Sequence, residues 1–307
     1  LDRLCANRIP KKDSSIVLTH MLNEKGRIQS ELTITRLSNN LFYVLSSTAS
    51  EIRDFDWFNR HLSKEETVNI KNVTKDYGVL VLAGPKSRKV LSQLTSQNLN
   101  NNDFPWLKGK EILINKIPVR ALRINYVGEL GWELHHPINH MESLYDSICE
   151  VGKKENIINF GTYAVNSMRM EKAYRGWGSE LTGEISLVEA GMDRFFNLKK
   201  KNNFFGAKAL QEKVQSGVDI KLVYLDVDAD NADAMGNEPI YHKNKIVGVT
   251  TSGSYGFRVK KSLAFGYVKS DLMNAGSELE IAIQGQRRKA KILDSAVYDQ
   301  DNQKLKA

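Results

Sequence analysis

With 307 residues, 41% hydrophobic side chains and 26% charged ones, the chain has the composition of a globular protein of two or three domains, which excludes fibrous and disordered classes. No apolar run reaches the roughly 18 residues that a membrane-spanning helix needs, so we expect no membrane partner. The net charge of +8 comes from scattered basic pairs and triplets without interleaved aromatic side chains, so we favour a small anionic ligand over nucleic acid.

The cysteines and histidines predict no metal or redox site. Cys5 and Cys149 stand far apart in the sequence, which fits a reducing compartment. His135, His136 and His140 lack a carboxylate or cysteine that would complete a set of metal ligands. The glycine fingerprints of dinucleotide-binding and phosphate-binding loops are also absent from the sequence, so a flavin would have to be bound by another segment.

The start of the chain carries no secretory signal pattern. The first residue is Leu1 rather than methionine, and the opening L-D-R-L-C-A-N-R has the pattern of a helix already under way. We therefore expect further residues before Leu1. The expected location is the cytoplasm for a bacterial protein and the mitochondrial matrix for a eukaryotic one.

Predicted helices and strands alternate through the first two thirds of the chain. Helices are expected from Ser50 to about Leu62, after Gly84-Pro85, from His140 to about Lys153 and from Thr162 to Tyr174, because apolar side chains recur there at helical spacing. The strands expected around them are residues 16–18, 31–35, 41–45, 67–73, 78–83, 111–114 and 119–126. This order indicates interleaved α+β units rather than a parallel doubly wound sheet.

The pattern changes from Ile220 onward, where short apolar runs are separated by turn residues. The predicted strands are residues 222–227, 239–241, 246–251, 262–268, 278–283 and 289–293. Such a series predicts a small antiparallel barrel or sandwich. A helix over about 207–214 and the turn at Ser216-Gly217 mark its beginning.

The stretch Asn125–Leu134, N-Y-V-G-E-L-G-W-E-L, is predicted to be a hairpin in which Tyr126 closes the first strand. Alternation along the second strand places Trp132 and Leu134 on one face and Glu133 on the other. A carboxylate on a stiff strand beside an aromatic ring suits a flat heterocycle that offers two parallel N–H donors. Taken alone, these residues favour the simpler alternative of a solvated glutamate on an ordinary hairpin.

Glu31 lies on the polar face of the strand 31–35, just after the turn at Lys25-Gly26-Arg27. One interpretation is a solvated surface carboxylate. The other is a general base, or an electrostatic partner for an amine that becomes cationic as it reacts. The strand by itself leaves both interpretations open.

Several stretches resemble the glycine-cleavage T-protein (aminomethyltransferase) family. Residues 125–134 resemble its Y-T-G-E-x-G-x-E segment, and residues 166–174 its R-L-E helix. Further similar stretches are residues 177–181, 189–192, 205–210 and 251–254. They cover essentially the whole chain in the order of the family, which makes the set more specific than any one motif.

Within that family, residues 1–7, 129–134 and 175–180 are similar to the folate-binding C-terminal half of dimethylglycine and sarcosine dehydrogenases. The resemblance implies that FAD is bound only if an N-terminal half exists outside this chain. It also implies a lipoyl carrier protein as a further possible partner.

The resemblance implies an α+β fold in which three domains form a cloverleaf around tetrahydrofolate. Two of the domains would be interleaved α+β units, and the third a C-terminal antiparallel β-barrel. The implied boundaries are residues 1–48 with 160–217, residues 49–159, and residues 218–307.

Four residues of the chain match family positions that contact the folate. By this resemblance, Glu133 would bind the 2-amino-4-oxo edge of the pterin, and Tyr126 would lie near the pterin ring. Tyr174 matches an aromatic contact on the R-L-E helix. Leu18 stands where some members have a tyrosine that contacts the pterin.

Two further positions depart from the family. Glu31 matches the second aspartate of the family's G-G-x-x-D-D motif, the catalytic carboxylate near the folate nitrogens, but glutamate is one methylene longer. Val165 stands where the T-protein has a folate-binding arginine. Arg258 or Lys260 is the expected substitute for that cation at the glutamyl tail.

The implied function is capture of the iminium or formaldehyde carbon from an N-methyl amine as 5,10-methylene-tetrahydrofolate, in a dimethylglycine or sarcosine dehydrogenase-like demethylase. A stand-alone aminomethyltransferase of the glycine cleavage system is the first alternative. A folate-binding module without turnover is the second.

Overall fold

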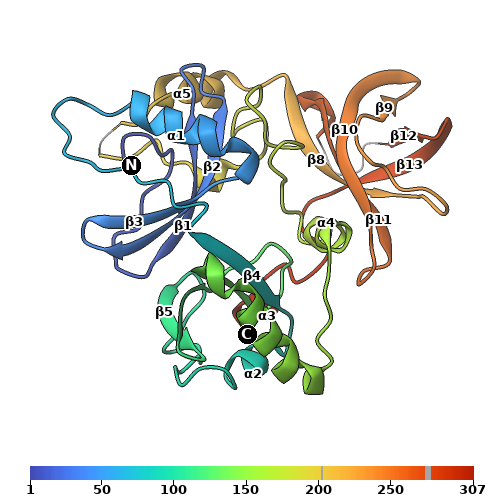
Figure 1. Ribbon diagram of the computed structural model, residues 1–307. Helices are drawn as coiled ribbons and strands as arrows, with labels where there is room; N and C mark the ends of the chain where they lie inside the picture. Colours follow the sequence, from blue (N-terminus) through green and yellow to red (C-terminus); the bar gives the residue numbers. More distant parts are fainter. Residues whose placement is uncertain (202, 274–277) are drawn as a thin grey trace.

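The computed structural model describes residues 1–201, 203–273 and 278–307 and has three lobes (Figure 1). One lobe is built on the sheet of strands β1 to β3, a second on strands β4 to β7, and the third is a barrel of strands β8 to β13. Helix α4 (Thr162–Glu171) lies between the second lobe and the barrel. None of the described helices is long and apolar enough to cross a membrane.

The first lobe contains an antiparallel sheet of β1 (Ile16–Leu22), β2 (Ile28–Ser38) and β3 (Leu41–Leu45). Helix α1 (Glu51–Arg60) covers one of its faces, and helix α5 (Ala207–Ser216) lies in the same lobe. Because side chains alternate along a strand, the covered face carries the apolar residues of the sheet. Those residues are Met21, Leu32, Ile34, Phe42 and Val44, which pack with Trp57 and Phe58 of α1.

The second lobe contains β4 (Tyr77–Ala83), β5 (Gly109–Ile114), β6 (Ile117–Leu122) and β7 (Gly131–Pro137). These strands pair in the order β4-β7-β6-β5, all antiparallel. The short helix α2 (Ser87–Leu91) and helix α3 (Met141–Gly152) close its core. Trp132 and Leu134 of β7 are fully buried there, as the alternation in the sequence predicts.

The third lobe is a closed antiparallel barrel. Its strands are β8 (Ile220–Val227), β9 (Pro239–His242), β10 (Lys245–Gly256), β11 (Lys261–Lys269), β12 (Leu279–Ile283) and β13 (Gln286–Leu293). Closure leaves no strand of this sheet with an unpaired edge. The predicted barrel is therefore confirmed, and so is the α+β class. The domain boundaries stay a prediction.

Three sequence-based predictions were wrong. Residues 67–73 form no strand, because almost all of them are exposed and Ile70 and Val73 do not alternate as a strand face would. The strand predicted over 119–126 ends at Leu122. The opening residues form a turn, in which the amides of Leu4 and Cys5 bond the carbonyl of Leu1, rather than a helix.

The β6–β7 connection is longer than a tight hairpin because the side chain of Asn125 redirects the backbone. Its Oδ1 accepts from the amides of Val127 (3.0 Å) and Gly128 (3.1 Å), and its Nδ2 donates to the carbonyl of Glu129 (2.6 Å). Gly128 has a φ of +74°, and a Cβ there would come within 2.2 Å of the Lys172 side chain. Because Gly128 has no side chain, the backbone of the loop can lie directly against the Lys172 side chain at the end of α4.

A buried ion pair joins α4 to the barrel. Arg169 Nη1 lies 2.9 Å from Glu180 Oε2, and the Glu180 side chain has no exposed surface. The other oxygen of Glu180 accepts from the hydroxyls of Thr251 and Ser252 on β10, each at 2.6 Å. Oε2 also accepts from the amide of Gly176 at 2.7 Å. The carboxylate is thus saturated with donors from three separate segments.

We predict that Glu180→Leu lowers the free energy of unfolding by about 3–5 kcal/mol, because it leaves the Arg169 guanidinium buried without a counter-charge. Urea unfolding followed by tryptophan fluorescence measures this loss. Adding Arg169→Met to the same chain should recover part of it. The matched control is Glu111→Gln, which removes the partner of Arg120 at an exposed site and should change stability by less than about 1 kcal/mol. A Glu180→Leu protein as stable as this control contradicts the prediction.

Candidate functional site

Glu31 lies on the face of the first sheet that α1 does not cover. The antiparallel register of β1 and β2 places it directly opposite His20, and Leu18 directly opposite Thr33 on the same face. His20 Nε2 lies 3.1 Å from Glu31 Oε1. The Glu31 side chain is 26% exposed, whereas that of His20 is fully buried. The structure thus presents one partly exposed carboxylate, bonded by a buried imidazole of the neighbouring strand, beside the half-buried Leu18.

Tyr126 and Tyr174 form a stacked pair, with ring centroids 5.8 Å apart and planes 21° from parallel. Tyr126 comes from the β6–β7 loop and Tyr174 from the segment just after α4. The hydroxyl of Tyr126 donates to the carbonyl of Arg175 at 2.5 Å. This bond and the stack hold the Tyr126 ring in one orientation.

The charges around Tyr126 connect it to Glu31. Burial raises the pKa of the Tyr126 phenol well above its usual range, and the carboxylates of Glu180 and Glu31 raise it further, whereas Arg169 and Arg175 oppose the rise. Glu31 therefore lies within electrostatic range of the phenol. The fold brings Tyr126 and Tyr174 into direct contact, and the charge of Glu31 acts on the phenol of Tyr126.

Glu133 lies on β7 with its backbone between β4 and β6, opposite Val81 and Leu122. Its side chain is 24% exposed, and Oε2 lies 3.3 Å from His135 Nε2. The other ring nitrogen of His135 lies 3.2 Å from the hydroxyl of Tyr43, which belongs to β3 of the first lobe. Glu133 therefore faces the junction of the first two lobes, and Oε1 is not engaged by any described side chain.

Arg258 does not offer a free cation. Its guanidinium bonds the carboxylates of Glu129 (2.7 Å) and Glu171, and it lies 3.8 Å from the centre of the Tyr298 ring. Four of its five donors are directed at these two carboxylates and at the backbone carbonyls of Val127 and Met168. Of the two cations expected to replace the arginine at Val165, only Lys260 is exposed and remains a candidate.

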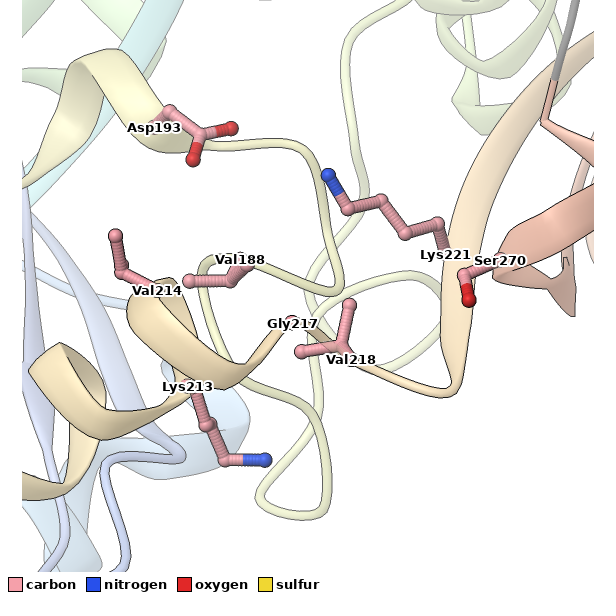
Figure 2. Close-up of a pocket in the computed structure, with 8 residues that line it drawn as sticks. All are labelled: Val188, Asp193, Lys213, Val214, Gly217, Val218, Lys221 and Ser270. Atoms are coloured by element: carbon pink, nitrogen blue, oxygen red, sulfur yellow. The ribbon is translucent and has the colours of Figure 1, made fainter.

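Figure 2 shows a separate hollow of about 330 Å³ between the end of α5 and the start of β8. It is lined by Val188, Asp193, Lys213, Val214, Gly217, Val218, Lys221 and Ser270. None of the predicted site residues lines it, so we do not assign the candidate site to this hollow.

Sequence reasoning missed His20 and the convergence on Glu180. His20 carries no motif, but pairing residues 16–22 with 28–35 in the register that buries their apolar side chains would have set it against Glu31. The groups that bond Glu180 come from the R-L-E-like helix, from residues 177–181 and from the T-S-G-like turn. Each of these stretches is a separate motif in the sequence, and only the fold joins them. Among the described residues, no group of histidine, cysteine and carboxylate side chains could hold a metal ion.

Comparisons with known proteins agree with this architecture. Two family models match: "GCVT N-terminal domain" over residues 1–200 and "Glycine cleavage T-protein C-terminal barrel domain" over residues 221–299. Dimethylglycine dehydrogenase, mitochondrial, of Rattus norvegicus is 42% identical over 294 residues, which are 95% of this chain and 34% of that protein. An aminomethyltransferase of Desulfitobacterium hafniense (strain Y51) is 30% identical over 299 residues, which are 97% of this chain and 80% of that protein.

The same fold occurs in the crystal structure of glycine cleavage system aminomethyltransferase T from Bartonella henselae. Its TM-score is 0.84 at 23% identity, over 94% of this chain and 77% of that one. The chain spans about a third of the length of the dimethylglycine dehydrogenase to which it is similar. With both family models matched in order and the three lobes reproduced, the chain belongs to the glycine-cleavage T-protein family.

Proposed function

We propose that this chain binds tetrahydrofolate and forms the one-carbon transfer region of a dimethylglycine or sarcosine dehydrogenase-like demethylase. The observation that carries the proposal is the pair of carboxylates Glu31 and Glu133, each about one quarter exposed and each hydrogen-bonded by one histidine. The 42% identity to a dimethylglycine dehydrogenase over nearly the whole chain supports this function over that of a stand-alone aminomethyltransferase.

Glu133 suits the amino-oxo edge of a pterin. Strands β4 and β6 pair with β7 on both sides, so the carboxylate projects from a stiff backbone. The ring N–H and the 2-amino group of a pterin form two parallel donors, which one carboxylate can accept in a bidentate pair. Since His135 contacts only Oε2, the carboxylate keeps the acceptor capacity that this pairing requires.

Tyr126, Tyr174 and Leu18 supply the apolar contacts in this proposal. The stacked tyrosines offer flat surfaces to an aromatic ring system, and the half-buried Leu18 offers an aliphatic one next to Glu31. A ligand that spans these groups would reach from the β7 carboxylate to the β2 carboxylate. Lys260 is our candidate for the anionic end of such a ligand.

Tetrahydrofolate supplies the nitrogens that take up the one-carbon unit, yielding 5,10-methylene-tetrahydrofolate. Glu31 accepts or relays the proton that leaves during this step, and its negative charge stabilises the cation that precedes it. Because the carboxylate is partly exposed at one oxygen and hydrogen-bonded at the other, it can face a reactant without losing its orientation. Holding both reactants at one site contributes much of the rate advantage.

The partners in this proposal are the methylamine-derived carbon and a flavin-binding half, on the same polypeptide or on another one. A lipoyl carrier protein takes the place of the flavin half if the chain is a stand-alone aminomethyltransferase. That alternative is favoured by the coverage of 80% of the Desulfitobacterium aminomethyltransferase. We propose a mitochondrial matrix location if the source is eukaryotic and a cytoplasmic one if it is bacterial.

For folate binding, we predict that Glu133→Ala weakens the affinity for 5-formyl-tetrahydrofolate roughly 10- to 100-fold, because a charge-assisted hydrogen-bond pair is lost. Thermal-shift titration measures this as a smaller rise in melting temperature at each ligand concentration. Glu111→Ala, an exposed glutamate in the same sheet, is the matched control and should titrate like the unchanged protein. If saturating ligand stabilises no variant, or if Glu133→Ala behaves like the control, the proposed pterin site is wrong.

For catalysis, we predict that Glu31→Gln in the protein with its flavin half leaves folate affinity nearly unchanged but slows methylene-folate formation roughly 100-fold or more, because the proton acceptor is gone. The measurement is the ratio of methylene-folate formed to free formaldehyde released per methylamine oxidised. Glu24→Gln, an exposed glutamate in the preceding turn, is the control. An unchanged ratio in Glu31→Gln removes Glu31 from the mechanism.

A further inference from the structure

His20 is the one buried titratable group that touches the proposed catalytic carboxylate. Its side chain has no exposed surface, and its Nε2 lies 3.1 Å from Glu31 Oε1 across the β1–β2 pair. In the described part of the chain, no other side chain bonds the Glu31 carboxylate. The position of that carboxylate therefore depends on this single contact.

The surroundings of Nδ1 decide which ring nitrogen of His20 carries the proton. Nδ1 of His20 is buried and has no hydrogen-bond partner among the described residues. A buried N–H without an acceptor costs more than a buried lone pair, because an unpaired donor loses its full hydration. The neutral tautomer with its proton on Nε2 is therefore favoured, and Nε2–H donates to Glu31.

The other elements around His20 contribute an aromatic ring and a backbone amide. The ring of Phe195, in the short 3-10 helix Asp193–Phe195, meets it edge-on at 6.0 Å and 84°. Asp193 and Arg194 of that helix are exposed. The guanidinium carbon of Arg194 lies over the Phe195 ring, 4.9 Å from its centre. On the backbone side, the carbonyl of His20 accepts from the amide of Ala6. Glu31 is the only one of these charged groups with a direct bond to the imidazole.

We propose that His20 is a positioning residue for Glu31: its Nε2–H bond fixes Oε1 and leaves Oε2 for the reacting proton. This inference rests on the proposed function. Glutamate has three rotatable side-chain bonds, so an unrestrained Glu31 would spread over several rotamers. Since Nδ1 has no onward partner in the part of the chain that the structure describes, His20 holds the carboxylate and does not carry the proton away.

A wild-type measurement tests the protonation state without depending on a variant. In the ¹⁵N-histidine spectrum, His20 should show a protonated Nε2 and an unprotonated Nδ1 throughout the pH range of activity. His20→Gln assigns the signal by its disappearance among the 6 histidines of the chain. A His20 ring with its proton on Nδ1, or with both nitrogens protonated at neutral pH, overturns the inference.

The functional test uses the protein with its flavin half and compares His20→Phe with His20→Gln. His20→Phe removes the one side-chain hydrogen bond that the described residues give the Glu31 carboxylate, and a hydrogen bond donated to a carboxylate favours its charged form. The acid limb of the pH profile for methylene-folate formation should then move to higher pH by about one unit, and the rate at neutral pH should fall roughly tenfold. His20→Gln keeps an N–H donor at a similar distance from Glu31. Its pH profile and its rate at neutral pH should therefore be close to those of the unchanged protein.

The control is His136→Phe, which removes another fully buried histidine with an unpartnered ring nitrogen from the second lobe. It should leave the pH profile in place, and affinity for 5-formyl-tetrahydrofolate should stay within about twofold in all three variants.

A His20→Phe profile identical to that of the unchanged protein overturns the inference, and so does an equal shift in His136→Phe. If Glu31→Gln itself retains full activity, the catalytic role proposed for Glu31 fails, and the role of His20 fails with it. If Glu31→Gln is slow and His20→Phe is normal, only the role of His20 fails.

Discussion

The placement of the candidate site depends on the buried pair of Arg169 and Glu180. Two charges removed from water destabilise a fold unless every lone pair and proton finds a partner. Here the carboxylate accepts bonds from α4, from the segment 176–180 and from β10 of the barrel. Any shift of one segment would leave the others with unsatisfied charge, so their relative positions are tightly defined. The segment they hold includes Tyr174 and the Arg175 carbonyl, which orients Tyr126.

A second network fixes the other end of the same loop. Arg258 reaches from the turn between β10 and β11 to Glu129 in the β6–β7 loop and to Glu171 at the end of α4. Beside it, Lys172 is buried, which lowers its pKa, and the carboxylate of Asp299 offsets that effect in part. The C-terminal segment returns from the barrel to the second lobe here (Figure 1). Tyr126 is therefore held both through its hydroxyl and through the backbone that carries it.

The two carboxylates of the proposed site have the same local construction on different sheets. Each projects from a strand, is about one quarter exposed, and is bonded by one buried histidine, while no described side chain bonds its other oxygen. Glu31 has its histidine across the strand pair, whereas Glu133 has its histidine two residues along the same strand. In this arrangement, strands supply rigidity and histidines supply orientation, while the acceptor oxygens stay available to a ligand.

The sequence by itself determined the elements and the family, because periodicity, turn residues and ordered motifs are local properties of the chain. Such local patterns predicted the barrel and the family-like stretch around Glu180. They also predicted the alternation of Trp132, Glu133 and Leu134. Residues 67–73 show the limit of such reasoning, since apolar residues form a strand only where a partner satisfies their backbone. Only the tertiary structure decided that Glu31 faces His20, that Arg258 is already occupied, and that three distant motifs meet at one carboxylate. The register that sets Glu31 opposite His20 follows from burying the apolar side chains of β1 and β2, but the direct contact between the two side chains does not. The contacts of Arg258 and Glu180 join segments that are far apart in the chain, and local patterns in the sequence do not specify them.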